Sequence, residues 1–190
     1  FAGVGSPRVV PFTIQTGPIP LTITSTLDTT DPLSGEGFTA SSGLQTMRLN
    51  RTGSLATCGA NRQCPGPTGT GAHRFDAYAF TNCTTRTSCI VATIGSNCSG
   101  GVFASAYQGT FNPNSLCSNY LGDSGLSPTT RPLEFAFTVS AGATFTIVVS
   151  DASPNAGLTC PYTLNLSGLC CQGSIGSCAT VSSLGSATAV

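Results

Sequence analysis

The sequence predicts an all-β fold, an antiparallel β-sandwich or jelly roll stapled by disulfides, with extended arms at its N- and C-terminal ends. Three observations predict it. Apolar residues alternate with Thr, Ser and Ala over most of the 190 residues, Gly, Pro, Asn and Asp separate these runs, and the chain contains ten cysteines. Alternation with period two is typical of half-buried strands, the separating residues favour turns, and this length can bury one full hydrophobic core.

The expected strands each place one row of apolar side chains on a single face. These rows are Leu21 and Ile23; Tyr78 and Phe80; Leu133, Phe135, Phe137 and Val139; Phe145, Ile147 and Val149; and Tyr162, Leu164 and Leu166. The runs 89–94 and 102–107 predict two more strands, and 65–71 and 124–132 are interpreted as loops rich in Pro and Gly. Because Gly142 stands in the turn over 140–143, we expect the strands on either side of it to form a hairpin.

The chain divides into a core and two arms. We expect the sandwich over 18–168, a strand-like N-terminal arm over 1–17, and a Gly/Ser-rich arm over 169–190 that carries three cysteines. In the N-terminal arm Val10, Phe12 and Ile14 alternate with Pro and polar residues. A strand without a partner leaves its backbone groups unpaired, so this arm is predicted to join a sheet edge, either its own or that of a neighbouring molecule.

The even number of cysteines indicates an oxidising compartment, because cytosolic thiols are kept reduced. We therefore expect an extracellular or cell-surface protein, and a first residue other than Met fits a product whose leader has been removed. Proximity in sequence favours the bridges Cys58 with Cys64, Cys83 with Cys89, and Cys98 with Cys117, and leaves Cys160, Cys170, Cys171 and Cys178 to pair among themselves. Ten cysteines allow about 945 pairings, so other connectivities stay open.

Charge excludes several classes of function. Charged residues make up 7% of the chain and balance to zero, and Lys is absent. So few cations provide no basic stripe for phosphate contacts, which argues against a nucleic-acid partner. Because a catalytic Schiff base forms on a Lys amine, the absence of Lys also excludes that chemistry. No run of 18 apolar residues is available to span a membrane.

Three sequence stretches carry a resemblance to a known family. They are RFDAYAFTN at 74–82, FTVSAGATFTIVVS at 137–150 and YTLNLSG at 162–168. Over about 21–168 the chain resembles the bacterial pre-peptidase C-terminal domain. The resemblance implies a small jelly roll of the kind appended to secreted proteases and surface proteins. This chain contains no catalytic domain for such a module to accompany, and its cysteines and arms are additions to the family pattern.

One motif invites an enzymatic interpretation. Gly122-Asp123-Ser124-Gly125 matches the nucleophile sequence of chymotrypsin-like proteases, with His73 as base and Asp76 or Asp28 as its orienting acid. The continuation is Leu-Ser where that family has Gly-Pro, and Arg rather than Cys follows His73. We therefore expect a turn-rich loop, a surface histidine and no enzyme.

Two kinds of surface chemistry stay open. Asp28, Asp31 and Glu36 supply oxygen ligands of the type Ca²⁺ prefers, although their spacing is not that of an EF-hand, and we expect no other cofactor or metal. The sequons at Asn50, Asn82, Asn97 and Asn165 would carry glycans if the host attaches them.

The arms decide between two expected functions. An alternating arm such as that of Val10, Phe12 and Ile14 predicts a structural subunit of an extracellular filament or surface assembly, in which copies of the chain polymerise by strand addition. The alternative is an accessory module of a larger exported protein that binds carbohydrate or matrix. Sugar-binding faces display aromatic rings, for which Tyr107 and Tyr120 are the candidates because Trp is absent.

Overall fold

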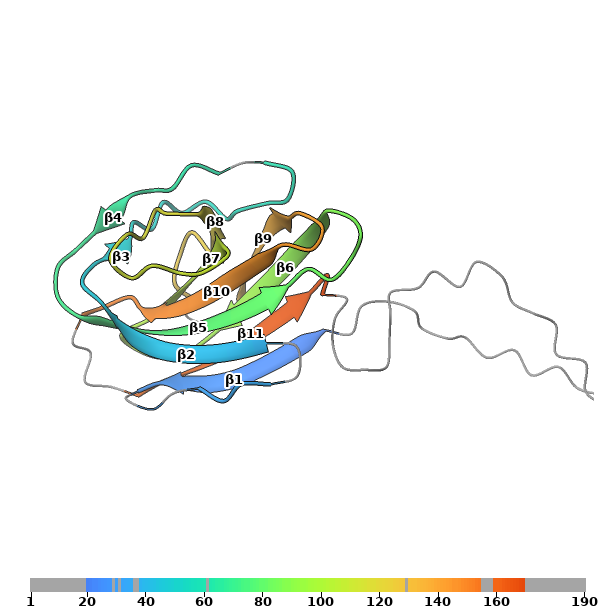
Figure 1. The fold of residues 1–190 in the computed structure, drawn as a ribbon. Coiled ribbons are helices and arrows are strands. Elements are labelled where there is room, and N and C mark those ends of the chain that lie inside the picture. The colour runs from blue at the N-terminus through green and yellow to red at the C-terminus, as the bar shows by residue number, and fades with distance from the viewer. Residues whose placement is uncertain are drawn as a thin grey trace, which may run out of the picture.

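The computed structural model describes residues 20–169, apart from 29, 31, 36–37, 61, 129 and 155–158. These residues form eleven strands and no helix. Two antiparallel sheets face each other as a sandwich, and a two-stranded ribbon accompanies them (Figure 1). The predicted all-β sandwich is confirmed. Residues 1–17 and 170–190, which make up nearly all of the two predicted arms, lie outside the described residues.

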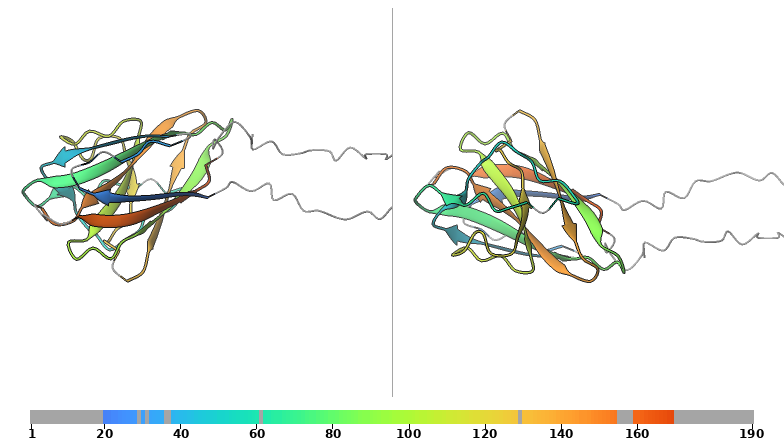
Figure 2. Two further views of the ribbon diagram at one scale, coloured as in Figure 1. Left: turned by 90° about the horizontal axis from the view of Figure 1, so that it is seen from below. Right: turned by 90° about the horizontal axis from the view of Figure 1, so that it is seen from above.

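The four-stranded sheet has the order β1 (Leu21–Leu27), β11 (Cys160–Ser167), β6 (Ser88–Gly95) and β9 (Leu133–Val139). The five-stranded sheet has the order β2 (Phe38–Gln45), β5 (His73–Thr81), β10 (Thr144–Asp151), β7 (Val102–Gln108) and β8 (Tyr120–Asp123). The ribbon pairs β3 (Arg48–Leu49) with β4 (Pro67–Thr68). Figure 2 shows β1 beside β11, which is its one neighbour among the strands that the structure describes.

The core lies between the sheets, where alternation directs one apolar row from each strand inward. Burial of these side chains supplies the main driving force for folding. The largest of them are fully buried: Tyr78, Ile90, Ile94, Phe135, Phe137, Phe145, Ile147, Leu164 and Leu166.

A second apolar layer covers part of the outer face of the five-stranded sheet. Its members lie on β5, β7, β8, β10 and the loop 109–119, with Leu49 from the ribbon: Leu49, Phe75, Ala77, Phe103, Tyr107, Phe111, Leu116, Tyr120 and Val148. This cover buries Tyr107, which is 1% exposed, and half-buries Tyr120. The prediction that Tyr107 is an exposed platform was therefore wrong.

The turn at 140–143 is present, but the predicted hairpin is wrong. Ala143 N donates to Ser140 O, yet β9 pairs with β6 while β10 pairs with β5 and β7. The chain crosses from one sheet to the other at this turn. The apolar rows of β9 and β10 therefore face each other across the core, an arrangement that the sequence pattern cannot distinguish from a hairpin.

Four strands were not predicted. β2 contains Thr, Ala, Ser, Ser and Gly between Phe38 and Leu44, so it has no apolar row of its own. β3 and β4 have two residues each and β8 has four, of which Gly122 and Asp123 belong to the motif interpreted as a loop. Pairing with neighbouring strands, rather than local pattern, makes these segments extended.

The predicted disulfide pairings are also wrong. The structure joins Cys58 to Cys89, Cys64 to Cys117 and Cys98 to Cys160, across sequence separations of 31, 53 and 62 residues. Cys83 is disulfide-bonded as well. The predicted pairs were chosen by proximity in sequence. In a sandwich, segments distant in sequence are neighbours in space, and geometry decides the pairing.

One side of the sandwich is closed by residues 54–58, here called the closing segment. Its Ala56 N donates to Asp123 O of β8 at 3.1 Å, and its carbonyl accepts from Ala136 N of β9 at 2.8 Å. The closing segment thus joins the edges of both sheets. On the other side β1 and β2 end their sheets, each with one neighbouring strand among the described residues.

Candidate functional site

The Gly-Asp-Ser-Gly motif holds the closing segment in place. Asp123 is fully buried and accepts hydrogen bonds from Tyr120 Oη at 2.5 Å and Gly125 N at 2.7 Å, and it forms an ion pair with Arg62 at 3.2 Å. Gly125 has a φ of 65°, and a Cβ there would lie 2.2 Å from Ser54 O. Arg62 also donates to Ser54 O, so the motif both allows close approach of the closing segment and anchors it through Arg62.

The structure does not assemble a protease triad. Ser124 is buried, and its Oγ donates to Leu126 O and accepts from Ala104 N. His73 is fully buried rather than exposed as predicted, and its Nδ1 donates to Asp151 O at 2.9 Å. β10 and β7 separate β5 from β8, which places His73 and Ser124 roughly 14 Å apart by strand spacing.

The calcium prediction finds no support among the described residues. Asp28 Oδ1 accepts hydrogen bonds from both Thr30 N and Thr30 Oγ1 at 2.6 Å, and these bonds lower the pKa of its carboxyl. Asp31 and Glu36 lie outside the described residues. No group of three or more His, Cys, Asp or Glu in the described part of the chain could hold a metal ion.

The four predicted sequons lie in different environments. Asn50 and Asn97 are exposed, and Asn165 is half-buried with Oδ1 accepting from Thr22 Oγ1. Asn82 is 4% exposed, and its Nδ2 donates to the carbonyls of Arg86, Val139 and Ser140 at 3.0 Å each. A glycan on Asn82 would break these bonds, so the folded protein excludes this predicted acceptor.

A buried carboxyl connects the two sheets. Asp76 of β5 is 2% exposed and accepts from Tyr162 Oη of β11 at 2.5 Å, with Ser25 Oγ of β1 at 3.5 Å. The Tyr78 and Tyr162 hydroxyls also bond to each other. Burial raises the pKa of Asp76 to about 6, against the Tyr162 hydrogen bond that lowers it. Burial likewise raises the pKa of Tyr162.

The best candidate for a binding site is a groove on the outer face of the five-stranded sheet. Two adjoining hollows of about 500 and 250 Å³ share Thr39, Ala79 and Thr110. The hollow exists because small side chains, Ala77 and Ala79 of β5, point outward at its centre. The loop after β7 forms one wall: Gly109 N donates to Thr144 O, and Gly109 O accepts from Thr146 Oγ1.

Aromatic rings and hydroxyl groups line this groove. At one end the Phe75 ring packs over Gly43, its cross-strand partner, where a Cβ would meet the ring at 2.9 Å. Phe111 packs edge-on against Phe75, with ring centroids 5.0 Å apart, and is half-buried. The exposed lining residues all carry hydroxyls or, in Gly35, no side chain: Gly35, Thr39, Ser41, Thr81, Thr110 and Thr144.

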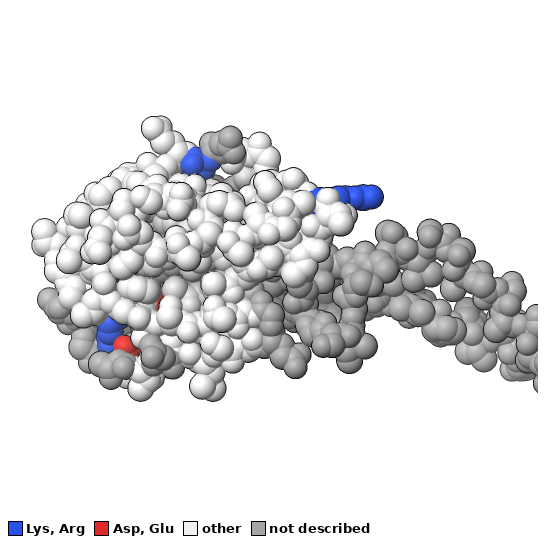
Figure 3. Space-filling view, in the orientation of Figure 1, with Lys and Arg blue, Asp and Glu red and all other residues white. Residues whose placement is uncertain are grey.

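The groove is electrically neutral. None of its lining residues is charged. On the face of the molecule drawn in Figure 3, charged side chains are few, and a basic and an acidic group touch each other at the lower left. The hydroxyls of Thr39, Ser41, Thr110 and Thr144 make no hydrogen bond to other described residues.

Sequence reasoning missed this site because β2 was not predicted. The one sequence signal for the groove was a set of Thr and Ser residues at outward strand positions. Such residues are common on any exposed strand, so they do not single out a binding site.

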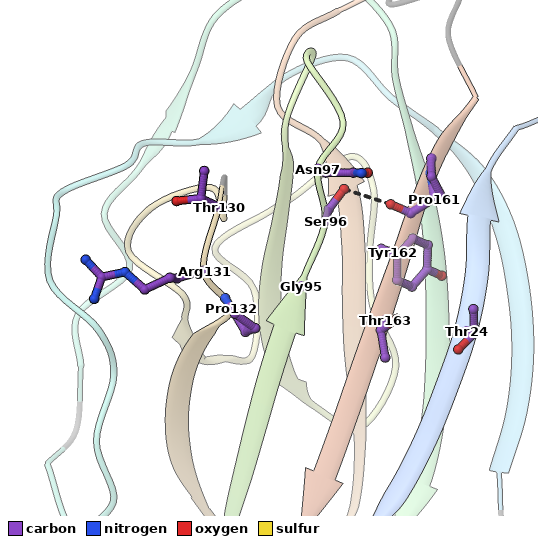
Figure 4. A pocket seen from close by; sticks show the side chains of 10 residues that line it. All are labelled: Thr24, Gly95, Ser96, Asn97, Thr130, Arg131, Pro132, Pro161, Tyr162 and Thr163. Atoms are coloured by element: carbon purple, nitrogen blue, oxygen red, sulfur yellow. Dashed lines mark hydrogen bonds between the residues drawn. The ribbon is translucent and has the colours of Figure 1, made fainter.

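A separate pocket of about 350 Å³ lies on the outer face of the four-stranded sheet. Its floor is Gly95, with Pro132 on one side and Pro161 and Thr163 on the other, while the Arg131 side chain points away from the centre (Figure 4). This pocket was not predicted either, because it needs β6, β9 and β11 side by side.

Comparisons with known proteins identify no family. No protein-family model matches the chain, and no curated protein matches it, so the resemblance to pre-peptidase C-terminal domains stays a prediction. Three solved structures, each 13% identical, show a distant likeness. The first is a β-1,3-glucan-binding CBM6 from Bacillus halodurans, with a TM-score of 0.35 over 70% of this chain and 97% of that one. The second is the C-terminal CBM6 of a marine laminarinase from Zobellia galactanivorans, with a TM-score of 0.33 over 78% of this chain and 99% of that one. The third is a family 29 carbohydrate-binding module from Piromyces equi, with a TM-score of 0.31 over 77% of this chain and 91% of that one.

Proposed function

We propose that this protein is a secreted, non-catalytic module that binds a neutral polysaccharide in the groove of the five-stranded sheet. The observation that carries the proposal is the composition of the groove. The exposed hydroxyls of Thr39, Ser41, Thr110 and Thr144 lack hydrogen-bond partners among the described residues. One end of the groove presents the rings of Phe75 and Phe111, and no lining residue is charged.

A sugar ring has the matching chemistry. Its hydroxyls exchange hydrogen bonds with Thr and Ser, and its C–H face packs against an aromatic ring such as Phe111. A groove without charge has no group to pair with the carboxylates or sulfates of acidic polymers, which would then lose hydration without compensation. Recognition sites are typically concave, largely apolar and supplied with a few polar groups, as this groove is.

The experiment is affinity electrophoresis in gels that contain β-1,3-glucan, mixed-linkage glucan, xylan or galactomannan. We expect retardation by at least one of these neutral polymers. Ala79→Tyr should weaken it, because the new ring would occupy the centre of the groove from an outward, half-buried position. The matched control is Val91→Tyr, on the outer face of the other sheet. The proposal would be refuted if the two variants were retarded equally, or if no polymer retarded any of the proteins.

Strand addition between copies is the second candidate. One observation favours it: β1 and β2 are outer strands on the side of the sandwich that the closing segment does not cover. An arm carrying Val10, Phe12 and Ile14 would pair with such an edge. If the protein remains monomeric by light scattering at high concentration, and deletion of residues 1–17 leaves its melting temperature unchanged, strand addition is wrong.

A further inference from the structure

We propose that the pocket over Gly95 is a second sugar-binding site, so that one molecule joins two polysaccharide chains. Only the class of ligand rests on the proposed function. The pocket is separate from the groove, because it opens on the outer face of the four-stranded sheet while the groove opens on that of the five-stranded sheet. Two sites on opposite faces cannot be filled by one straight stretch of polymer.

The pocket exists because a glycine replaces a side chain in β6. Gly95 pairs with Thr163 of β11, and the inward neighbour Ile94 is fully buried in the core. A side chain at position 95 would project outward between Pro132 and Thr163. Its absence leaves the hollow that the two prolines border (Figure 4).

Covalent and hydrogen bonds hold the walls in place. Cys98 and Cys160 form a disulfide that joins the chain just after β6 to the start of β11. Between these cysteines and the pocket, Ser96 Oγ donates to Pro161 O at 2.7 Å and accepts from Cys98 N at 3.2 Å. A pocket pre-formed in this way loses little conformational entropy when a ligand binds.

The lining fits a single neutral sugar ring. The exposed rings of Pro132 and Pro161 offer flat C–H surfaces on either side of the floor. Hydrogen-bonding side chains stand around them, and none makes a hydrogen bond to another described residue: Thr24, Asn97, Thr130, Arg131 and Thr163. Arg131 is the one charged residue in the lining, and it provides donors at the rim without facing the floor (Figure 4).

A molecule with two such sites cross-links its ligand. When both sites engage neighbouring polysaccharide chains, the second contact is effectively intramolecular, and overall avidity exceeds that of either site alone. This gives the module an adhesive role in a polysaccharide matrix, without requiring the protein to polymerise.

The test separates the two sites by stoichiometry. Calorimetry with short oligosaccharides of the retained polymer should give two sites for the wild type, one for Gly95→Val and one for Ala79→Tyr. Turbidity on mixing with the soluble polymer should appear for the wild type alone. Gly95→Val is expected to fold normally, because a Cβ there stands 3.6 Å from Pro132, in ordinary contact, and its melting temperature checks this.

The outcomes distinguish this inference from the proposed function. One site in the wild type, lost in Ala79→Tyr and kept in Gly95→Val, would overturn the second site and leave the groove in place. One site lost only in Gly95→Val would overturn both bivalency and the groove. Two sites with a folded Gly95→Val that still cross-links would show that the second site lies elsewhere.

Discussion

At the scale of residues, the buried polar groups connect elements that apolar packing alone would leave free to shift. Asp76 joins β5 to β1 and β11 through Ser25 and Tyr162. Asn82 bonds to the turn that crosses between the sheets, through its side chain and through Asn82 N to Ala143 O. Buried polar groups are stabilising only when their partners are present, so each is a sensitive position.

The raised pKa of Asp76 predicts that stability falls as pH rises. The pKa is about 6 in the folded protein and 3.8 for an unperturbed carboxyl. Between these values the folded state keeps a proton that the unfolded state has released, so the free energy of unfolding decreases from pH 4 to pH 7, by about 2 kcal/mol. Asp76→Asn stays neutral and should abolish this decrease.

Urea unfolding of the wild type and Asp76→Asn at pH 4 and pH 7 measures the difference. Asp28, Asp151 and Arg74, the other charged groups near Asp76, are common to both proteins and cancel in the comparison. We expect Asp76→Asn to be the more stable protein at pH 7 and to have no advantage at pH 4. Parallel pH profiles for the two proteins would contradict the assignment.

Asn82→Ala is expected to lower the free energy of unfolding by about 2–4 kcal/mol. The substitution removes the Nδ2 donor that bonds to three carbonyl oxygens, and its hydrogen bond to Val139 O is buried. Asn165→Ala is the control, because its one described hydrogen bond is exposed, and it should change stability by less than about 1 kcal/mol. Equal effects of the two substitutions in urea denaturation would count against this role for Asn82.

At the scale of elements, β8 and the closing segment explain a motif whose sequence resembles a catalytic one. The glycines of Gly122-Asp123-Ser124-Gly125 leave space for Ala56 and Ser54, and Asp123 binds Arg62. The sequence shows the motif but not its neighbour, because the closing segment lies about 65 to 70 residues earlier in the chain. The same limit explains why β2, which has little local pattern, was missed although β5 pairs along its full length.

Arg62→Met is expected to destabilise the protein by about 3–5 kcal/mol, because it leaves the buried Asp123 carboxylate without its ion pair. Arg86→Met is the matched control. Arg86 is exposed, and we expect a change within about 0.5 kcal/mol. Thermal or urea unfolding followed by circular dichroism measures both variants, and similar stability of the two would show that the ion pair does not anchor the closing segment.

At the scale of the whole molecule, three disulfides connect segments that the topology brings together. Cys98 with Cys160 joins β6 to β11, Cys58 with Cys89 joins the closing segment to β6, and Cys64 with Cys117 joins segments that cover the outer apolar layer. In the described residues each bridge spans at least 31 residues of sequence. Such bridges restrict the unfolded chain more than the short loops that we predicted.

Replacing Cys64 and Cys117 together by Ala should lower the free energy of unfolding by about 4 kcal/mol, the value expected for a loop of 53 residues. Because neither cysteine lines the groove, retardation by polysaccharide should persist in the folded variant. Peptide mapping without reduction checks the pairing directly, and recovery of a Cys58–Cys64 peptide would contradict this topology.

The sequence by itself determined the fold class, the rows of the core and the presence of disulfides, because alternation and cysteine content are local or compositional properties. It placed β1, β5, β6, β7, β9, β10 and β11, whose apolar rows are continuous. The tertiary structure alone decided which strands share a sheet, which cysteines pair, and that His73 and Tyr107 are buried. It also decided both candidate sites, because the groove and the pocket over Gly95 are formed by outward residues of strands distant in sequence, and only the packing of the sheets makes them neighbours.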